Sequence, residues 1–564
     1  MGKKKKTTPR QRPGPVSPKG LIKLDYTWGL VFFILLVAIA LRVHLLNVPL
    51  ERDEGEYAYA GQLILQGFLP YAKVYSMKMP GIFGAYALMM AILGQTLTGI
   101  HLGLMLVNLA TIIFIFLLGK QLVDRTTGAV AAVSFAVLSV GQSVQGVFAN
   151  AEHFVILPAV AGMLILLRAT DSRRSLPLFL SGLLFGLAFL MKQHGAAFIA
   201  FALVYLIYQG RRTQSASLKP VLTNILLLLA GATLPFILIC LFFLASGIFD
   251  KFWFWTFSYA REYVSLTSPA QGWAIFLYSF RAVVSSAPLL WVLAGCGLLA
   301  PIIDPKARAR LFFIETLVIF SFLATIPGFY SRPHYFVLVL PAISLLIGIG
   351  LSSMGRLLAN VGQSATKLVP VAIILFALGF TVYQQRLFLF GVDPVLASRL
   401  TYQADPFPES LKIAQYLKER TSSEDTIAVV GSEPQIYFYT HRHAATGYIY
   451  TYPLMEPQPY VLRMQDDMIR EIEASRPAYL VYADIPKTSW FLRPESPRLI
   501  FDWLRRYSSE FYDCVGVIEY TISSNLTEYH WDEAVKGYQH FPSTSLSNGN
   551  AGSHSIYVYK RKPY

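Results

Sequence analysis

The sequence has few charged side chains and very few cysteines. Only 14% of its 564 residues are charged, whereas 54% are hydrophobic, and the mean hydropathy is +0.47. This composition excludes an ordinary water-soluble or disordered chain and indicates a protein whose main surroundings are lipid. The three cysteines, Cys240, Cys296 and Cys514, lie far apart, so neither a disulfide framework nor a cysteine-based metal site is indicated.

The sequence also lacks a cleavable signal peptide and a nucleotide-binding fingerprint. Residues 1–25 are too long and too polar for the start of a signal peptide, so we expect residues 27–46 to remain as a membrane span. No GxGxxG motif supports nucleotide binding in the C-terminal third. The net charge of +15 lies largely in this basic tail and in short loops, which indicates orientation on a membrane and no nucleic-acid partner.

Long apolar runs fill the chain from residue 26 to residue 388. Short loops between them, such as "KQLVDRTTG" and "DPKARAR", are rich in Lys and Arg and mark the cytoplasmic face together with the N-terminal tail. Successive loops must alternate between the two faces of the membrane, and this holds only if one early apolar run does not cross fully. The run 80–98, with its proline and three glycines, is the better candidate. We predict an α-helical polytopic bundle of about 11–13 spans over residues 26–388.

The same alternation places several polar loop ends together on one outer face. In the first outer loop, residues 47–80, Asp53 and Glu54 are adjacent acids that repel each other and gain nothing as membrane anchors, so we interpret them as functional. For Glu152 and Lys192, at the ends of apolar helices, anchoring and function stay equally open. We interpret the aromatic stretch "KFWFWTFSYAREY" as an interfacial belt, with contact to a lipid or a sugar as the open alternative. The other polar residues on this face are Lys78, His153, His194, Arg332 and His334.

Acids and cations on one outer rim suit sugar transfer from a lipid phosphate. One carboxylate assists the acceptor hydroxyl as a general base, and Lys, Arg or protonated His stabilises the departing phosphate. A hydrophobic groove between spans would hold the polyprenyl chain.

The first outer loop resembles that of the GT-C membrane glycosyltransferases. Its elements are Asp53-Glu54, the tyrosines Tyr57 and Tyr59, the stretch "GFLPY" ending at Tyr71, and Lys78 two residues before Pro80. The loop is similar to that of the branch holding protein O-mannosyltransferases, lipid A aminoarabinose transferases and Rgt-type galacturonosyltransferases.

This resemblance implies roles for particular residues. Asp53 is implied as the general base of an inverting transfer, with Glu54 and Glu152 as further catalytic residues. The donor phosphate is implied to contact Lys78, Lys192, Arg332 and His334. We expect substrate contacts from Tyr57, Tyr59, Tyr71, His153 and His194. In this branch a metal is not generally required, so we expect no cofactor, although a divalent cation on the outer acids stays open.

Residues 390–564 change character and predict an extracytoplasmic α/β domain. "DTIAVVG", "AYLVYAD", "YDCVGVIEYTI" and "SIYVYKRK" have the length and pattern of strands, and "YVLRMQDDMIREIEA" that of a helix. The whole chain therefore predicts an integral membrane enzyme, in a bacterial plasma membrane, that moves a sugar from a polyprenyl phosphate to an unidentified lipid, glycan or protein. Two alternatives stay open: a transporter or flippase of lipid-linked sugars, and a transferase of a whole oligosaccharide.

Overall fold

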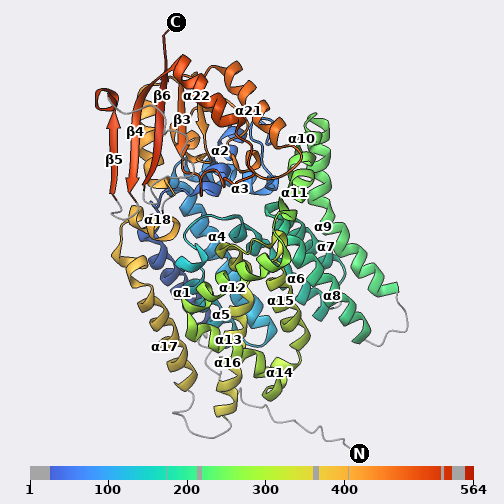
Figure 1. Cartoon of the computed structure of the whole chain (residues 1–564). Coiled ribbons are helices and arrows are strands. Elements are labelled where there is room, and N and C mark those ends of the chain that lie inside the picture. The colour runs from blue at the N-terminus through green and yellow to red at the C-terminus, as the bar shows by residue number, and fades with distance from the viewer. Residues whose placement is uncertain are drawn as a thin grey trace, which may run out of the picture.

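The computed structural model describes residues 26–172, 174–212, 219–359, 368–403, 405–521, 526–536 and 553–563. The basic tail predicted at residues 1–25 lies outside them. Figure 1 shows a helical bundle with a sheet-containing domain at one of its ends. The predicted fold class, a polytopic helical bundle followed by an α/β domain, is confirmed.

The helices of the bundle and of its outer loops run from residue 26 to residue 384. Their bounds are α1 (Tyr26–Arg42), α2 (Arg52–Leu65), α3 (Pro80–Leu93), α4 (Leu97–Leu122), α5 (Arg125–Leu138), α6 (Ala151–Ser172), α7 (Leu176–Met191), α8 (Ala196–Arg212), α9 (Lys219–Ala245), α10 (Phe249–Trp253), the π-helix η4 (Phe254–Tyr259), α11 (Ala260–Ser265), α12 (Pro269–Ser285), α13 (Pro288–Ile303), α14 (Pro305–Arg308), α15 (Leu311–Leu323), the 3-10 helix η6 (Pro333–Leu338), α16 (Leu340–Ala359) and α17 (Val369–Gln384).

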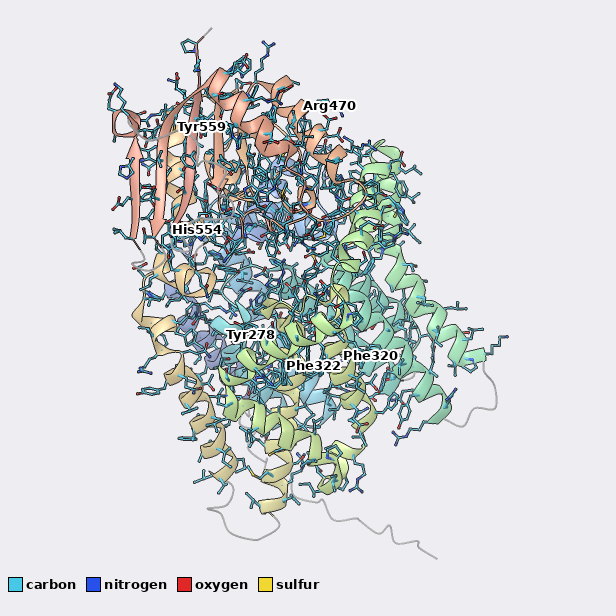
Figure 2. All side chains as sticks on the ribbon, viewed as in Figure 1. Tyr278, Phe320, Phe322, Arg470, His554 and Tyr559 are labelled. Atoms are coloured by element: carbon cyan, nitrogen blue, oxygen red, sulfur yellow. The ribbon has the colours of Figure 1, made fainter. Side chains whose placement is uncertain are left out.

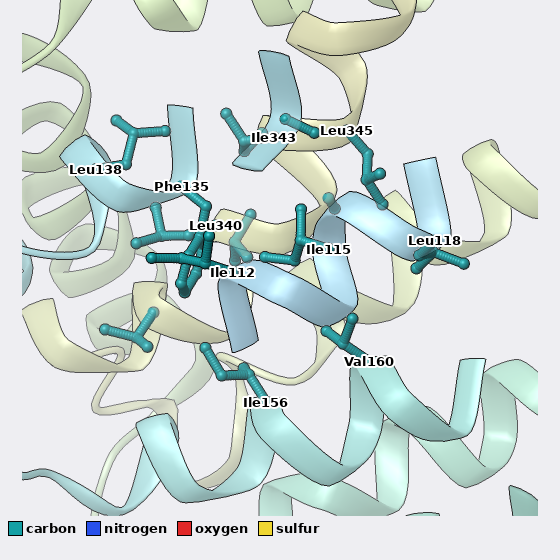
Figure 3. Close-up of a cluster of buried hydrophobic side chains, with 14 of the residues drawn as sticks. Ile112, Ile115, Leu118, Phe135, Leu138, Ile156, Val160, Leu340, Ile343 and Leu345 are labelled. Carbon is teal, nitrogen blue, oxygen red and sulfur yellow. The ribbon is translucent and has the colours of Figure 1, made fainter. Parts of the chain in front are cut away.

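The core of the bundle is built from apolar side chains of four central helices. Figure 3 shows aliphatic and aromatic side chains from α4, α5, α6 and α16 packed into one buried cluster. Helix α7 lies so close to α9 that a Cβ on Gly182 would meet the Leu228 carbonyl oxygen at 2.0 Å. Small residues at such crossings are typical of helix packing in membranes, where backbones approach closely.

Five helices in the described part of the chain are long and apolar enough to cross a membrane: Thr27–Leu45, α4, α6, α9 and α16. The pair α12 and α13 meets the same test jointly but is bent by 104° at its break. Shorter apolar helices are α3, α5, α7, α15 and α17. With 14 residues, α3 is shorter than the roughly 20 that a span needs, as expected for a segment that does not cross fully. The exact number of crossings stays a prediction.

The predicted inner and outer loops gather at opposite ends of the bundle. At one end, Arg356 pairs with both Asp124 and Asp304, and Arg310 pairs with Asp171 at 2.8 Å. All of them come from the basic loops predicted to face the cytoplasm or from a helix end next to one. At the other end lie α2 and α3, close to the C-terminal domain (Figure 1).

The C-terminal domain is a six-stranded mixed sheet with helices around it. Strand order is β2-β1-β3-β6-β4-β5; β1 is parallel to β2 and β3, and the pairs β3–β6, β6–β4 and β4–β5 are antiparallel. The predicted strands and helix are present. The bounds are α18 (Pro394–Tyr402), α19 (Phe407–Glu419), β1 (Thr426–Val430), α20 (Gln435–Thr440), β2 (His443–Ala444), α21 (Val461–Ser475), β3 (Tyr479–Asp484), α22 (Leu499–Phe511), β4 (Tyr512–Thr521), β5 (Leu526–Trp531) and β6 (Ser553–Arg561).

Candidate active site

A cleft opens between the outer end of the bundle and the C-terminal domain. It encloses about 560 Å³, including its open mouth. Its walls come from four separate parts of the chain: the first outer loop, the segment around η4, the start of η6, and the loop that follows β2. They contribute Asp53, Glu56, Tyr75, Ser76, Met77, Lys78, Trp255, Tyr259, Tyr263, Arg332, His334, Tyr335, Tyr450, Tyr452 and Pro453.

Asp53 and Lys78 form an ion pair inside this cleft. The Lys78 ammonium lies 2.8 Å from Asp53 Oδ2, and 18% of the lysine side chain is exposed against 9% of the aspartate. Burial acts to raise the pKa of Asp53, but the charges of Lys78 and Arg332 outweigh it and hold the pKa well below its usual range. Asp53 is therefore ionised at any physiological pH. The structure thus brings Asp53 and Lys78, two of the predicted site residues, together in one cleft.

Helix α2 turns Asp53 and Glu54 to different surroundings. Residues three apart share a helix face, whereas neighbours do not, so Glu56 joins Asp53 in the cleft and Glu54 does not. Glu54 is fully buried, accepts hydrogen bonds from the Glu51 and Ala149 backbone amides, and lies 2.9 Å from His101 Nε2. With Glu51 it forms the capping box that begins α2. The role that the structure shows for Glu54 is to hold the helix that carries Asp53.

Arg332 brings a second cation to the cleft. Its guanidinium lies 5.9 Å from the Tyr330 ring centre and, among the described residues, has no carboxylate within ion-pair distance. Tyrosine hydroxyls at Tyr263, Tyr335 and Tyr450 are its polar surroundings. A guanidinium with five donors and no anionic partner is suited to bind a phosphate.

The predicted residues Glu152, Lys192 and His334 form a buried cluster behind the cleft wall. Lys192 pairs with Glu152 and lies 4.0 Å from the centre of the Tyr335 ring, so its charge is already compensated. His334 lines the cleft, with Nδ1 2.7 Å from Gln145 Oε1 and Nε2 4.0 Å from Glu152. Burial and the Lys192 charge hold the pKa of His334 well below its usual range. His334 is therefore neutral in this structure, where a protonated histidine was expected.

The five residues predicted to contact substrate are not among the residues that line the cleft, although Tyr57, Tyr71 and His194 contact residues that do. The Tyr57 ring packs edge-on against Tyr86, the Tyr59 hydroxyl accepts from the Ala444 amide, and the Tyr71 hydroxyl donates to the Lys78 carbonyl. His153 is buried inside α6, and the His194 ring lies 4.7 Å from that of Tyr335. Tyr71 ties the first outer loop to itself through Lys78, Tyr57 packs on α3, and Tyr59 joins α2 to the C-terminal domain through Ala444.

The aromatic stretch interpreted as an interfacial belt contributes directly to the cleft, which corrects that interpretation. Trp255, Tyr259 and Tyr263 line it, and the first two belong to the π-helix η4. A π-helix rotates the following side chains relative to an α-helix and is frequent at functional sites. The sequence pattern does not reveal it, since rings at a membrane surface have the same composition in both cases.

The C-terminal domain completes the cleft and holds α2 of the first outer loop in place. The Tyr450 hydroxyl donates to Asp53 Oδ1 at 3.2 Å. Arg52, next to Asp53 in the chain, is buried and reaches the domain through Asp405 at 3.0 Å and Glu433 at 2.9 Å. A Cβ on Gly55 would lie 2.6 Å from the Gln435 nitrogen, so α2 packs directly on α20.

Three or more potential metal ligands come close together at one place in the described part of the chain. They are Glu519, Glu528 and His530 on the β4–β5 hairpin, outside the cleft. In the cleft itself, Asp53 and Glu56 are accompanied by Lys78 and Arg332, whose positive charges oppose cation binding.

Comparisons with known proteins agree with this architecture. Residues 78–259, less than half of the chain, match the family model described as dolichyl-phosphate-mannose-protein mannosyltransferase. No curated protein matches the chain in sequence.

Two solved structures share the fold. ArnT from Cupriavidus metallidurans bound to undecaprenyl phosphate is 17% identical, with a TM-score of 0.52 over 81% of this chain and 93% of that one. The archaeal oligosaccharyltransferase AglB from Archaeoglobus fulgidus, in complex with an inhibitory peptide and a dolichol-phosphate, is 13% identical, with a TM-score of 0.51 over 93% of this chain and 76% of that one. The protein has the fold of the GT-C superfamily of membrane glycosyltransferases.

Proposed function

We propose that the protein transfers a sugar from a polyprenyl-phosphate donor to an acceptor hydroxyl at the outer face of the membrane. The observation that carries the proposal is the Asp53–Lys78 pair, which shares one cleft with Arg332, a guanidinium that forms no ion pair with any carboxylate in the described part of the chain. A carboxylate for the hydroxyl and two cations for a phosphate are the groups that such a transfer requires. The family description and the lipid phosphates bound in the ArnT and AglB structures support this substrate class.

In the proposed reaction these groups act as follows. The acceptor oxygen attacks the anomeric carbon from the side opposite to the phosphate, and the carbon–oxygen bond to the phosphate breaks. The hydroxyl proton passes to the Asp53 carboxylate, and the electron pair of the broken bond stays on the lipid phosphate, next to Lys78 and Arg332. Attack from the opposite side inverts the anomeric configuration.

Donor binding also prepares the base. In the structure Lys78 keeps the pKa of Asp53 low, which makes this carboxylate a weak proton acceptor. A phosphate that attracts Lys78 and Arg332 weakens their effect on Asp53 and adds a negative charge nearby, so it raises the pKa of Asp53. The base is therefore strongest when the donor is bound.

The proposal is tested by turnover of the purified full-length protein in detergent. Radiolabelled polyprenyl-phosphate sugars are offered with membrane extracts as acceptors, and the products are sized by mass spectrometry. Loss of the general base in Asp53→Asn is expected to lower turnover by at least about 100-fold. Asp513→Asn, on an exposed position of β4, is the matched control and is expected to retain activity.

Equal turnover in wild type and Asp53→Asn would refute the assigned base. A product that is larger by a whole oligosaccharide would replace single-sugar transfer by the alternative reaction in the same cleft.

A further inference from the structure

A second pocket lies directly beside the cleft, on the outer side of the molecule. It encloses about 760 Å³, including its open mouth, and shares Tyr75 and Trp255 with the cleft. The two shared rings are stacked, with centres 5.5 Å apart and planes 9° apart. One wall of the side pocket comes from α10 and η4, and the opposite wall from the C-terminal domain through Tyr448 and α21. The stacked rings of Tyr75 and Trp255 therefore lie between a molecule in this side pocket and the cleft that contains Asp53.

The side pocket is lined with aromatic rings. Besides Tyr75 and Trp255, it contains Phe254, Tyr448 and Tyr460. Tyr460 packs edge-on against Phe254 with ring centres 5.1 Å apart, and Tyr448 packs edge-on against Tyr75 at 4.8 Å. Tyr75 is stacked on Trp255 and also faces the Lys251 ammonium at 5.6 Å, so the partly exposed Tyr460 at the rim is the ring that suits the C–H face of a pyranose.

The polar groups of the side pocket carry both signs of charge. Asp250 and Lys251 are exposed at its edge, and Arg463 pairs with Asp467 across 3.6 Å. Charged acceptors and donors in nearly equal number match the hydroxyl groups of a neutral sugar, which donate and accept hydrogen bonds. A phosphate or an acidic polymer would instead meet the Asp250 and Asp467 carboxylates.

The backbone at this place is already hydrogen-bonded. The Tyr75 amide donates to the Gly447 carbonyl at 2.9 Å, and the Gly447 amide donates to Glu471 Oε2 at 3.0 Å. Glu471 also accepts from the Tyr75 hydroxyl at 2.8 Å. A peptide bound in extended form depends on free backbone groups, and the Tyr75 and Gly447 amides are already bonded. The side pocket therefore favours a ring-shaped ligand over a peptide.

We propose that the side pocket binds a neutral sugar unit of the acceptor, so that the acceptor is a glycan or the carbohydrate head of a glycolipid. The proposal rests on the function proposed above, because it names the acceptor class of the same reaction. The acceptor hydroxyl reaches Asp53 in the cleft, while the neighbouring sugar unit lies against Tyr460 and near Asp467.

The test measures binding without any donor, using the full-length protein in detergent. Mannotriose, cellotriose and chitotriose are titrated and followed by saturation-transfer NMR. At least one is expected to bind the wild type and to bind Asp467→Asn at least about tenfold more weakly, because a hydrogen bond to a charged group is lost. Tyr460→Ala is expected to weaken it similarly.

The matched control is Asp466→Asn, one residue away on α21. Asp466 is exposed, lies outside the side pocket and shares with Asp467 the partner Arg470, which lies 3.1 Å from Asp467 and which Figure 2 labels among the C-terminal elements, so the two substitutions remove the same kind of ion pair and differ in their contact with the side pocket. Its replacement is expected to leave saccharide binding unchanged.

Three outcomes overturn the proposal: none of the three saccharides binds, Asp467→Asn and Asp466→Asn behave alike, or a Ser/Thr peptide displaces the bound saccharide. These outcomes leave the donor reaction and its dependence on Asp53 intact. Conversely, saccharide binding with turnover that does not depend on Asp53 would retain the side pocket and remove the proposed base.

Discussion

Two clusters of charged side chains lie at opposite ends of the bundle. Both contain carboxylates and cations, but the two clusters serve different purposes. The inner cluster consists of Asp124, Asp304 and Arg356, and the outer cluster of Asp53, Lys78 and Arg332. In both, carboxylates lie beside cations at the ends of apolar helices. The difference lies in the number of partners that each charge has within the protein.

In the inner cluster each carboxylate is held by the backbone. Asp124 caps α5 through the Thr127 amide at 2.9 Å, and Asp304 caps α14 through the Lys306 amide at 3.1 Å. Arg356 then joins both caps. These contacts tie α5, α14 and α16 together, which is a structural use of charge.

In the outer cluster the contacts are fewer and open to a cleft. Asp53 receives hydrogen bonds from the side chains of Lys78 and Tyr450, and Arg332 has no ion pair among the described residues. A cation without an anionic partner beside a cleft can bind a ligand anion, whereas a paired cation cannot without losing its partner. Open bonding capacity, more than charge or burial, therefore distinguishes the functional cluster.

The largest effect that tests this difference is expected for Arg332→Met. Loss of the charged hydrogen bonds to a donor phosphate is expected to lower kcat/KM by about 10- to 100-fold. The melting temperature is expected to stay close to that of the wild type, because no ion pair within the described protein is broken. Titration of donor and thermal unfolding of the same preparation check both parts. A large drop in melting temperature would show that Arg332 is structural.

The matched substitution in the inner cluster is Arg356→Met. It leaves two partly buried carboxylates without their cation, so the free energy of unfolding is expected to fall by about 1–2 kcal/mol. Activity per folded molecule is expected to be unchanged, since the cluster lies at the end of the bundle opposite to the cleft. Thermal unfolding in detergent and turnover normalised to folded protein check this. Reduced activity in fully folded protein would remove the contrast between the two clusters.

The sequence predicts the bundle, the strands of the C-terminal sheet and the gathering of polar loops at one end, because apolar length, alternation and loop charge are local signals. The Asp53–Lys78 pairing follows from the resemblance of the first outer loop. The contribution of Tyr450 and Tyr452 could not be predicted, because they lie about four hundred positions from Asp53 and no periodicity encodes that contact.

The structure places the adjacent acids Asp53 and Glu54, both interpreted as functional from the sequence, in different surroundings. Both acids were interpreted as functional because they are neighbours, yet a helix places them on different sides. In the structure Glu51 and Glu54 cap α2, and the helix brings Glu56, three residues after Asp53, into the cleft as its second acid. Glutamate is not a usual N-cap residue, so the sequence does not mark this helix start.

The smallest effect is expected at Glu56, and it appears only as a pH dependence. Burial, with a further contribution from the Asp53 charge, raises the pKa of Glu56 to about 7, although Lys78 and Ser76 oppose this. Above that pH Glu56 is ionised and repels a donor phosphate, so donor affinity of the wild type is expected to fall by a factor of about 3 to 5 between pH 6 and pH 8. Asp53 stays ionised and His334 neutral across this range, so neither produces the change.

Glu56→Gln is expected to abolish this decrease, because glutamine stays neutral at both pH values. It is also expected to flatten a fall in stability between about pH 4.5 and pH 7, since a carboxyl with a raised pKa binds its proton more tightly in the folded than in the unfolded state. Glu456, whose pKa is also raised to about 7 by burial, accepts from Tyr259 and provides the control. The opposite result would contradict this: Glu456→Gln would remove the pH dependence of donor affinity and Glu56→Gln would not. The group that titrates would then be Glu456 in the wall of the cleft, and Asp53 would remain as the one acid in the cleft that acts on the donor.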